Sequence, residues 1–306
     1  MIKMVSIRNI RRILKSKATV EGAGVQLKRS FGFHHVPQLD PFLLLDDFHS
    51  DNPEDYIKGF PWHPHRGIET ITYVLHGEVE HGDSMGNRGV IRSGDVQWMT
   101  AGRGIIHQEM PKGQRDGLMW GFQLWANLPA SHKMMEPRYR EVKNNQIPET
   151  TLEDGAKVKV ICGKVNNVTG PVRDIVTNPE YLDVKIPARS KFLHSARSGH
   201  TVFAYVIEGK GYFDQRRDPY AYEVEGTNYF DFERSCLIGP ESLVVFDDGD
   251  QLIFTTADEP VRFLLASGKP LREPVAWYGP IVMNTQEELR LAFEEYQNGT
   301  FVKKQR

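Results

Sequence analysis

The chain has 306 residues, of which 40% are hydrophobic and 25% are charged, and its formal net charge is -2. This composition is typical of a globular protein and argues against a disordered or fibrous one. The small net charge argues against direct binding to nucleic acid or to an acidic membrane surface. Because one hydrophobic core seldom grows beyond about 250–300 residues, we expect two domains.

Two further features bear on the compartment. No run of about 18 apolar residues predicts a membrane span, and the N-terminus lacks the apolar core of a secretory signal. The two cysteines, Cys162 and Cys236, lie far apart, which fits a reducing compartment and offers no cysteine metal site. We therefore expect a cytoplasmic protein, and the basic residues that precede the first acidic one leave a nuclear location open.

Short β-type segments dominate the chain, and Gly, Asp and Asn separate them at short intervals, which is typical of an all-β sandwich or barrel. In chain order the predicted strands fall within residues 70–81, 89–99, 118–128, 157–165, 181–187, 201–213, 242–246, 251–256 and 261–268. The exception is a helical pattern over residues 285–301. Thr285 is a suitable N-cap, Glu287 and Glu288 suit the first turn, and Gly299 suits the C-terminal end.

An internal repeat indicates how these strands are organised. Residues 71–83 (ITYVLHGEVEHGD) resemble residues 203–214 (FAYVIEGKGYFD), and both contain Tyr-Val-aliphatic-x-Gly. The repeat predicts two related β domains in tandem. We place an N-terminal barrel at residues 1–140, a polar linker at 141–155, and a second barrel at 156–306 that includes the C-terminal helix.

Two pairs of side chains predict a metal site in the first domain. On a strand, alternate residues point to the same side, so His63 and His65 form one pair, and His107 and Glu109 form another. Two such pairs on neighbouring strands can converge inside a barrel. Three imidazoles and a carboxylate suit Fe(II), Mn, Ni, Cu or Zn and leave coordination positions free for other molecules.

The repeat offers a control for this prediction. Aligning the two copies pairs His63 with Ser195, His65 with Arg197, His107 with Phe254 and Glu109 with Thr256. None of the four counterparts is a usual ligand for a transition metal. The metal site is therefore predicted in the first domain, and the second domain is predicted to be free of metal.

Other residues near these motifs receive weaker predictions. Gly102 and Gly104 predict a tight hairpin before His107. His76 and His81 flank a glycine turn and are predicted to lie in a loop, while no partner is evident for His132 and His194. Apolar residues around the motifs are expected to form core, with some of them lining a cavity: Phe60, Trp62, Trp98, Met99, Ile105, Ile106 and Trp120.

Five segments together resemble the pirin family of the cupin superfamily. They are LDPFLLLDDF (39–48), FPWHPHRGIETITYVLHGEVEHGDSMGN (60–87), GDVQWMTAGRGIIHQEMP (94–111), LWANLPASHKMMEPRY (124–139) and GPIVMNTQEELRLAFEEYQNGTF (279–301). Thr70 stands where many cupins have a glutamate ligand, and Glu109 stands as the substitute carboxylate. The resemblance implies a bicupin of two jelly-roll barrels, with one Fe(II) bound by His63, His65, His107 and Glu109 in the first. It also implies that the C-terminal helix packs back on the N-terminal barrel.

The resemblance also implies two kinds of function. One is a quercetin 2,3-dioxygenase, which would use dioxygen to cleave a flavonol-like aromatic molecule, with Glu109 as the general base. The other is a redox-sensitive iron protein that binds a transcription factor. A zinc-dependent hydrolase or isomerase on the same scaffold is a third alternative, and we expect a monomer in each case.

Overall fold

The computed structural model describes residues 5–227, 230 and 234–303. Over these residues the chain is built mainly of β-strands, with one α-helix, α1 (Gln286–Gln297), near the C-terminus. Four short 3-10 helices occur among the loops: η1 (Phe33–His35), η2 (Pro53–Asp55), η3 (Ala130–His132) and η4 (Asn144–Gln146). The predicted all-β architecture with a C-terminal helix is confirmed. No helix in this part of the chain is long and apolar enough to cross a membrane.

The chain divides into two compact units, each built from two separate segments. The first unit comprises Met1–Lys17 and Ile147–Pro270, and the second comprises Ala18–Gln146 and Leu271–Arg306. The polypeptide therefore passes between the units at three places, whereas a single linker was predicted at residues 141–155. The second unit thus contains most of the predicted N-terminal barrel, and the first unit contains most of the predicted second barrel. Both the proposed ligands and the C-terminal helix belong to the second unit.

Two sheets form the main part of the second unit. The seven-stranded sheet has the order β12 (Arg138–Val142), β9 (Val96–Thr100), β6 (Ile68–His76), β11 (Met119–Asn127), β4 (Phe42–Ser50), β3 (Val25–Phe31) and β2 (Lys17–Glu21). The four-stranded sheet has the order β5 (Phe60–His65), β10 (Ile105–Lys112), β7 (Glu78–Asp83) and β8 (Arg88–Arg92). Polar side chains on the inner faces of these sheets form the site described below.

The first unit contains an eight-stranded sheet and two short pairs. The large sheet has the order β13 (Glu149–Thr151), β14 (Lys157–Cys162), β17 (Glu180–Ile186), β23 (Val261–Gly268), β19 (Thr201–Gly209), β21 (Ser242–Phe246), β1 (Ile10–Lys15) and β20 (Glu223–Glu225). The pairs are β18 (Lys191–Ser195) with β22 (Gln251–Thr255), and β15 (Lys164–Val165) with β16 (Val168–Thr169).

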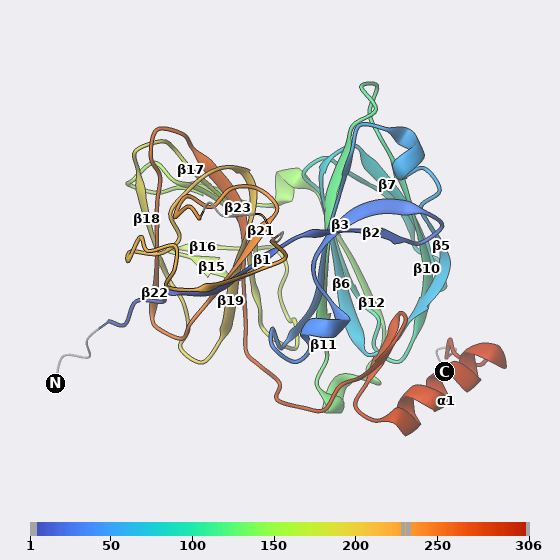
Figure 1. Ribbon diagram of the computed structural model, residues 1–306. Helices are drawn as coiled ribbons and strands as arrows, with labels where there is room; N and C mark the ends of the chain where they lie inside the picture. The colour runs from blue at the N-terminus through green and yellow to red at the C-terminus, as the bar shows by residue number, and fades with distance from the viewer. Residues whose placement is uncertain (1–4, 228–229, 231–233, 304–306) are drawn as a thin grey trace. The chain divides into compact units, whose positions relative to one another are not determined.

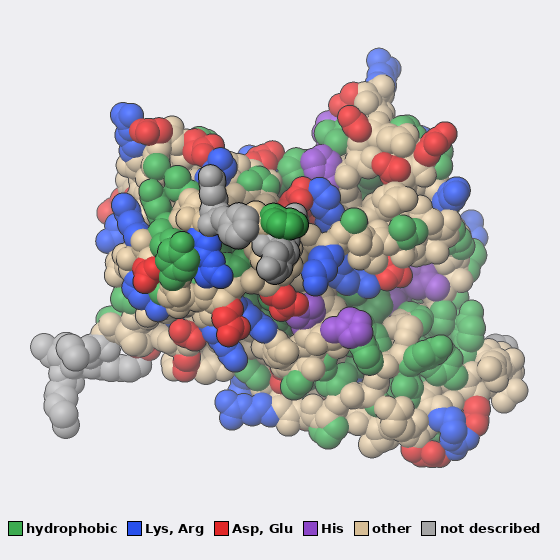
Figure 2. Space-filling model, viewed as in Figure 1, with side chains coloured by type: hydrophobic (Ala, Val, Ile, Leu, Met, Phe, Trp, Pro, Cys, Tyr) green, Lys and Arg blue, Asp and Glu red, His purple; other side chains and the backbone are tan. Residues whose placement is uncertain are grey.

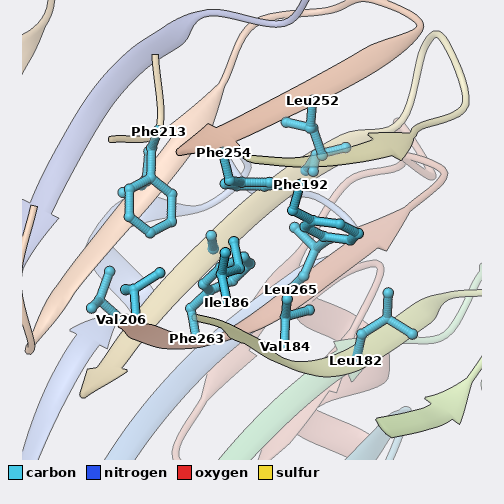
Figure 3. Close-up of a cluster of buried hydrophobic side chains, with 14 of the residues drawn as sticks. Leu182, Val184, Ile186, Phe192, Val206, Phe213, Leu252, Phe254, Phe263 and Leu265 are labelled. Atoms are coloured by element: carbon cyan, nitrogen blue, oxygen red, sulfur yellow. The ribbon is translucent and has the colours of Figure 1, made fainter. Parts of the chain in front are cut away.

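The interior of the first unit is a continuous hydrophobic core (Figure 3). Phe192 and Phe254 stack with their ring centroids 5.7 Å apart, and Phe213 and Phe263 meet the Phe254 ring at 5.4 and 4.7 Å. All four rings are buried. Aromatic pairs at such separations stabilise a core beyond their area of contact.

The C-terminal segment adds β24 (Ala276–Tyr278), β25 (Ile281–Met283) and α1 to the second unit. Thr285 caps the helix, and its hydroxyl oxygen accepts a hydrogen bond from the backbone of Glu288, whose side chain in turn accepts from the Thr285 backbone. Leu289 and Ala292 are buried on the helix face that packs in a cluster with β24 and β25. Because the predicted N-cap and first turn are observed, the helix prediction is confirmed.

Charged side chains of both signs are exposed on one face of the molecule (Figure 2). On the face drawn in Figure 2, Lys and Arg side chains are interspersed with Asp and Glu. This mixture agrees with the formal net charge of -2. It does not form the broad single-sign surface that steers nucleic acid to a protein.

Candidate metal centre

Three histidines converge inside the second unit. Strands β5 and β10 pair antiparallel, and His63 lies directly opposite His107. One ring nitrogen from each of His63, His65 and His107 falls within 4.8 Å of the others, so the group could hold a metal ion. His65 and His107 are buried and His63 is half-buried. The prediction that two strand-borne pairs lie on neighbouring strands therefore agrees with the structure.

Hydrogen bonds to backbone carbonyls orient two of the three rings. His63 Nδ1 lies 2.8 Å from the carbonyl oxygen of Pro61, and His65 Nδ1 lies 2.9 Å from that of Pro280. A carbonyl only accepts, so each Nδ1 carries the proton and each Nε2 presents its lone pair. The two Nε2 atoms are 3.0 Å apart. Two facing lone pairs repel, and a cation bound by both nitrogens would remove that repulsion.

His107 supplies a second sign that the group is a ligand set. Both of its ring nitrogens are buried and have no hydrogen-bond partner among the described residues. Burial lowers the pKa of His63 and lowers that of His65 and His107 still further, so all three imidazoles are neutral near pH 7. Neutral imidazole is the form that binds a transition metal. The residues present therefore fit a bound metal ion.

The fourth predicted ligand, Glu109, is held differently. Its carboxylate accepts hydrogen bonds from Thr72 Oγ1 at 2.8 Å and from Gln123 Nε2 at 2.9 Å. It is not one of the group whose ligand atoms lie within 4.8 Å of one another. Burial raises the pKa of Glu109 to about 7, although both hydrogen bonds act to lower it. The carboxylate is thus ready to take up a proton near neutral pH, and its coordination of a metal stays a prediction.

A bulge and a turn shape the ligand strands. The pairing of β5 with β10 shifts between His107 and Glu109, since Glu109 lies opposite Phe60, whereas an unbroken antiparallel register would place it opposite Pro61. Such a bulge re-aims side chains next to a site. Gly102 and Gly104 have φ angles of 50° and 136°, so the predicted turn is present. The hairpin prediction is wrong, however, because β9 and β10 belong to different sheets.

The C-terminal segment reaches the ligands from far along the chain. The backbone of Val282 donates to the carbonyl of Arg66 at 3.1 Å, which brings Pro280 to His65. A Cβ on Gly67 would lie 1.9 Å from the Val282 carbonyl oxygen, so only glycine allows this approach. Sequence reasoning missed Pro280, Thr72 and Gln123, because no local signal marks a partner that strand register or a distant segment brings to a ligand.

A cavity of about 640 Å³ adjoins the histidines. His63, His65 and Glu109 line it, as do polar residues of the seven-stranded sheet. Its apolar lining includes Leu27, Phe33, Leu44, Phe48, Phe60, Val79, Trp125 and Trp277. Of the seven apolar residues singled out in the sequence, Phe60 lines the cavity. Trp98, Met99 and Ile105 are instead buried in the core, and Trp62 is half exposed.

His81 lies close behind the ligand group. It was predicted to lie in a loop, but it is buried on β7, with its ring stacked on Tyr139 at a centroid distance of 4.6 Å. Its ring centroid is 6.2 Å from that of His107. The loop prediction fails because β7 continues for several residues after the glycine turn at Gly77.

Strand pairing corrects the comparison between the two units. Strand β18 pairs with β22 as β5 pairs with β10, and Phe192 lies opposite Phe254 as His63 lies opposite His107. The counterparts of His63 and His65 are therefore Phe192 and His194, not Ser195 and Arg197. His194 also has a partner, since its Nε2 lies 2.7 Å from Glu180 Oε2.

Two β-sandwich units, one of them with imidazoles converging beside a cavity, define a protein of the cupin class. The pirin family model matches residues 24–126, and the model of the pirin C-terminal cupin domain matches residues 181–302. A pirin-like protein of Caulobacter vibrioides is 40% identical over 296 residues, which cover 96% of this chain and 99% of that protein. A pirin-like protein of Solanum lycopersicum is 39% identical, with 95% and 91% covered.

A solved structure agrees with these matches. The crystal structure of quercetin 2,3-dioxygenase from Acinetobacter baumannii has a TM-score of 0.83 and 30% sequence identity, covering 97% of this chain and 99% of that one. The chain belongs to the pirin family. The predicted bicupin fold is thereby confirmed.

Proposed function

We propose that the protein is an iron-dependent dioxygenase that opens the heterocycle of a flavonol such as quercetin. The observation that carries the proposal is the convergence of three neutral imidazoles at one end of a cavity of about 640 Å³, with the Glu109 carboxyl beside them. A cavity of this size suits a drug-sized aromatic ligand. The similarity to a solved quercetin 2,3-dioxygenase supports the choice of reaction.

His63, His65 and His107 would hold the metal through their ring nitrogens, and Glu109 is the fourth proposed ligand. When bound, Fe(II) supplies Lewis acidity toward an oxygen of the substrate and one-electron chemistry with dioxygen. The backbone carbonyls of Pro61 and Pro280 keep the rings of His63 and His65 in the required tautomer. The apolar walls exclude water from the reacting end of the ligand.

Glu109 is the proposed general base. A flavonol must lose the proton of its enol hydroxyl, and a carboxylate with a pKa of about 7 can accept that proton at Oε1 or Oε2. Thr72 and Gln123 hold the carboxylate by one hydrogen bond to each oxygen. This arrangement fixes the direction of the remaining lone pairs, so the base stays in place before the ligand enters.

One experiment tests the function. Purified protein is loaded with one Fe(II) per chain, and the loss of quercetin and of dioxygen is followed together. We expect both to disappear in equal amounts, and protein loaded with Zn(II) to be inactive. Activity with Zn(II) in the absence of oxygen would favour a hydrolase or isomerase, and loss of neither reactant would refute the dioxygenase.

A further inference from the structure

We propose that a row of polar side chains across the seven-stranded sheet recognises the hydroxyl groups of a neutral polyphenol and disfavours ligands with a carboxylate at the same place. The row consists of Arg29, Asp46, Gln123 and Thr72, with Glu21 beside Arg29. The inference rests on the proposed function, because it concerns the ligand of the same cavity.

Strand register places these residues in one line. Arg29 on β3 lies opposite Asp46 on β4, Asp46 lies opposite Gln123 on β11, and Gln123 lies opposite Thr72 on β6. Directly opposed residues of antiparallel strands point to the same face of a sheet. All four side chains, and that of Glu21, line the cavity. Three strand spacings make the row about 14 Å long, enough for a ligand of two or three rings.

Apolar residues border the row on both sides. Two positions along the strands in one direction lie Leu27 and Phe48, and two positions in the other lie Leu44 and Trp125. All four also line the cavity. A ligand that fits this wall must have apolar faces and oxygen atoms along one edge, which describes an aromatic compound with several hydroxyl or carbonyl groups.

The guanidinium of Arg29 is already engaged. Its Nε and Nη2 donate to the two oxygens of Asp46 at 2.8 and 2.7 Å, and its Nη1 donates to Glu21 at 2.7 Å. The two N–H groups of Arg29 that could bind a ligand carboxylate side by side are therefore already bonded to Asp46. Two carboxylates and one guanidinium leave a net charge of about -1 at this end of the row, which repels an acid.

The carboxylates can still accept hydrogen bonds from a ligand. Each oxygen of Asp46 accepts one bond from Arg29 and keeps a further lone pair. A phenolic hydroxyl can donate to it without adding charge. At the other end, Gln123 donates to Glu109, so the row begins at the proposed base and ends at Asp46 and Arg29. A ligand with its enol at Glu109 would reach Asp46 with its distal ring.

The test measures binding apart from turnover. Iron-loaded protein is titrated calorimetrically under anaerobic conditions with quercetin, with 3-hydroxyflavone, which lacks the distal hydroxyls, and with a 3-hydroxyflavone that carries a carboxylate on that ring. We expect quercetin to bind about 10- to 100-fold more tightly than 3-hydroxyflavone, because a hydrogen bond to a charged group is lost. The carboxylated compound should bind most weakly.

Asp46→Asn should remove most of the preference for quercetin and leave the affinity for 3-hydroxyflavone unchanged. Because this change leaves a partly buried guanidinium with weaker partners, Glu21→Gln, nearer the solvent, serves as the second variant and should reduce the preference less. The control is Asp258→Asn, which breaks an exposed ion pair with Arg189 in the other unit and should change nothing.

Equal losses for both compounds in Asp46→Asn, tight binding of the carboxylated compound, or no binding of any probe to the wild-type protein would overturn the proposal. The protein could prefer quercetin through Asp46 and yet fail to turn it over. That result would refute the dioxygenase proposal and leave the proposal about recognition standing. The two proposals can therefore fail separately.

Discussion

Strands β5 and β10 in one unit and β18 and β22 in the other form equivalent pairs, but the side chains at their inward positions differ. In the first pair His63 faces His107, and in the second Phe192 faces Phe254. His63 and its strand neighbour His65 line a cavity, whereas the phenylalanines fill a core and stack on each other. The comparison teaches that the strand pairing alone does not make a site. The residues at the inward positions decide whether the interior can bind a ligand or is filled by a packed hydrophobic core.

The two interiors also differ in how burial of their side chains affects stability. Burial of the phenylalanine rings stabilises the first unit directly. The imidazoles of the second unit are buried with lone pairs facing one another and with the His107 nitrogens unpaired among the described residues. Unsatisfied buried polar groups cost free energy, so a cation bound by these imidazoles would stabilise the second unit.

Exchanging one residue between the units should have the largest effect. His107→Phe places in the second unit the residue that stands at the same position in the first. We expect the iron content to fall from about one ion per chain to nearly none, and kcat/KM for quercetin to fall at least 10³-fold. Metal analysis and single-substrate kinetics measure both.

The same variant separates binding from folding. Without metal, His107→Phe should be as stable as the wild type or more stable by about 1–3 kcal/mol, because two unpaired buried nitrogens are removed. A variant that keeps its iron would show that His107 is not a ligand.

Phe254→Ala tests the opposite side of the comparison. Removal of a ring that contacts four other phenylalanines should lower the free energy of unfolding of the first unit by about 3–5 kcal/mol. Urea denaturation measures the change, and Phe254→Leu should cost less. The iron content should remain at one per chain in both variants. A loss of iron would mean that the first unit contributes to the metal site.

Glu109→Gln should have a smaller and more selective effect. We expect most of the iron to remain and kcat to fall about 10²- to 10³-fold, because the enol proton loses its acceptor. Wild-type kcat should rise with pH up to the pKa of Glu109 and level off above it; this pKa is about 7 in the metal-free protein and is lower with a cation bound. The variant should lack this slope, and retained activity with an unchanged pH profile would remove Glu109 as the base.

The same carboxyl should affect stability with a defined sign. Its pKa is raised in the folded protein from an ordinary value of 4.5, chiefly by burial. The metal-free protein should therefore lose stability as pH rises from about 4.5 to 7, because ionisation is easier in the unfolded chain. Glu109→Gln should abolish that part of the decline, as denaturation curves at pH 5 and pH 7.5 would show.

Alternation along single strands made the histidine group predictable. His63 and His65 on β5, and His107 on β10, follow the period-two rule, and the two strands do pair. The capped helix from Gln286 was predictable for the same reason, because its signals lie within a few residues of one another. Local patterns therefore predicted that the three histidines come together and that the C-terminal helix begins after Thr285.

Features that depend on register or on distant segments could not be predicted. Pro280 lies far along the chain from His65, and the polar row at Asp46 exists only because four strands align in one register. The alignment of the two repeats failed for a related reason. It was shifted by three residues, and an odd shift turns every side chain of a strand to the other face. This shift concealed that His194, and not Arg197, is the counterpart of His65.

Replacement of His194 should have the smallest effect of these changes, and it tests directly whether one inward histidine is enough to bind metal. His194 occupies in the first unit the position of His65, but its Nε2 lies 2.7 Å from Glu180, and its strand neighbour Phe192 is the counterpart of His63. His194→Gln should cost about 1 kcal/mol in the stability of the first unit, because one hydrogen bond is weakened. Iron content and turnover should not change, whereas His65→Gln should lose both. If His194→Gln lowered the iron bound per chain, a single inward histidine without its partners would suffice to bind metal, and the contrast between the two interiors would no longer explain where the site lies.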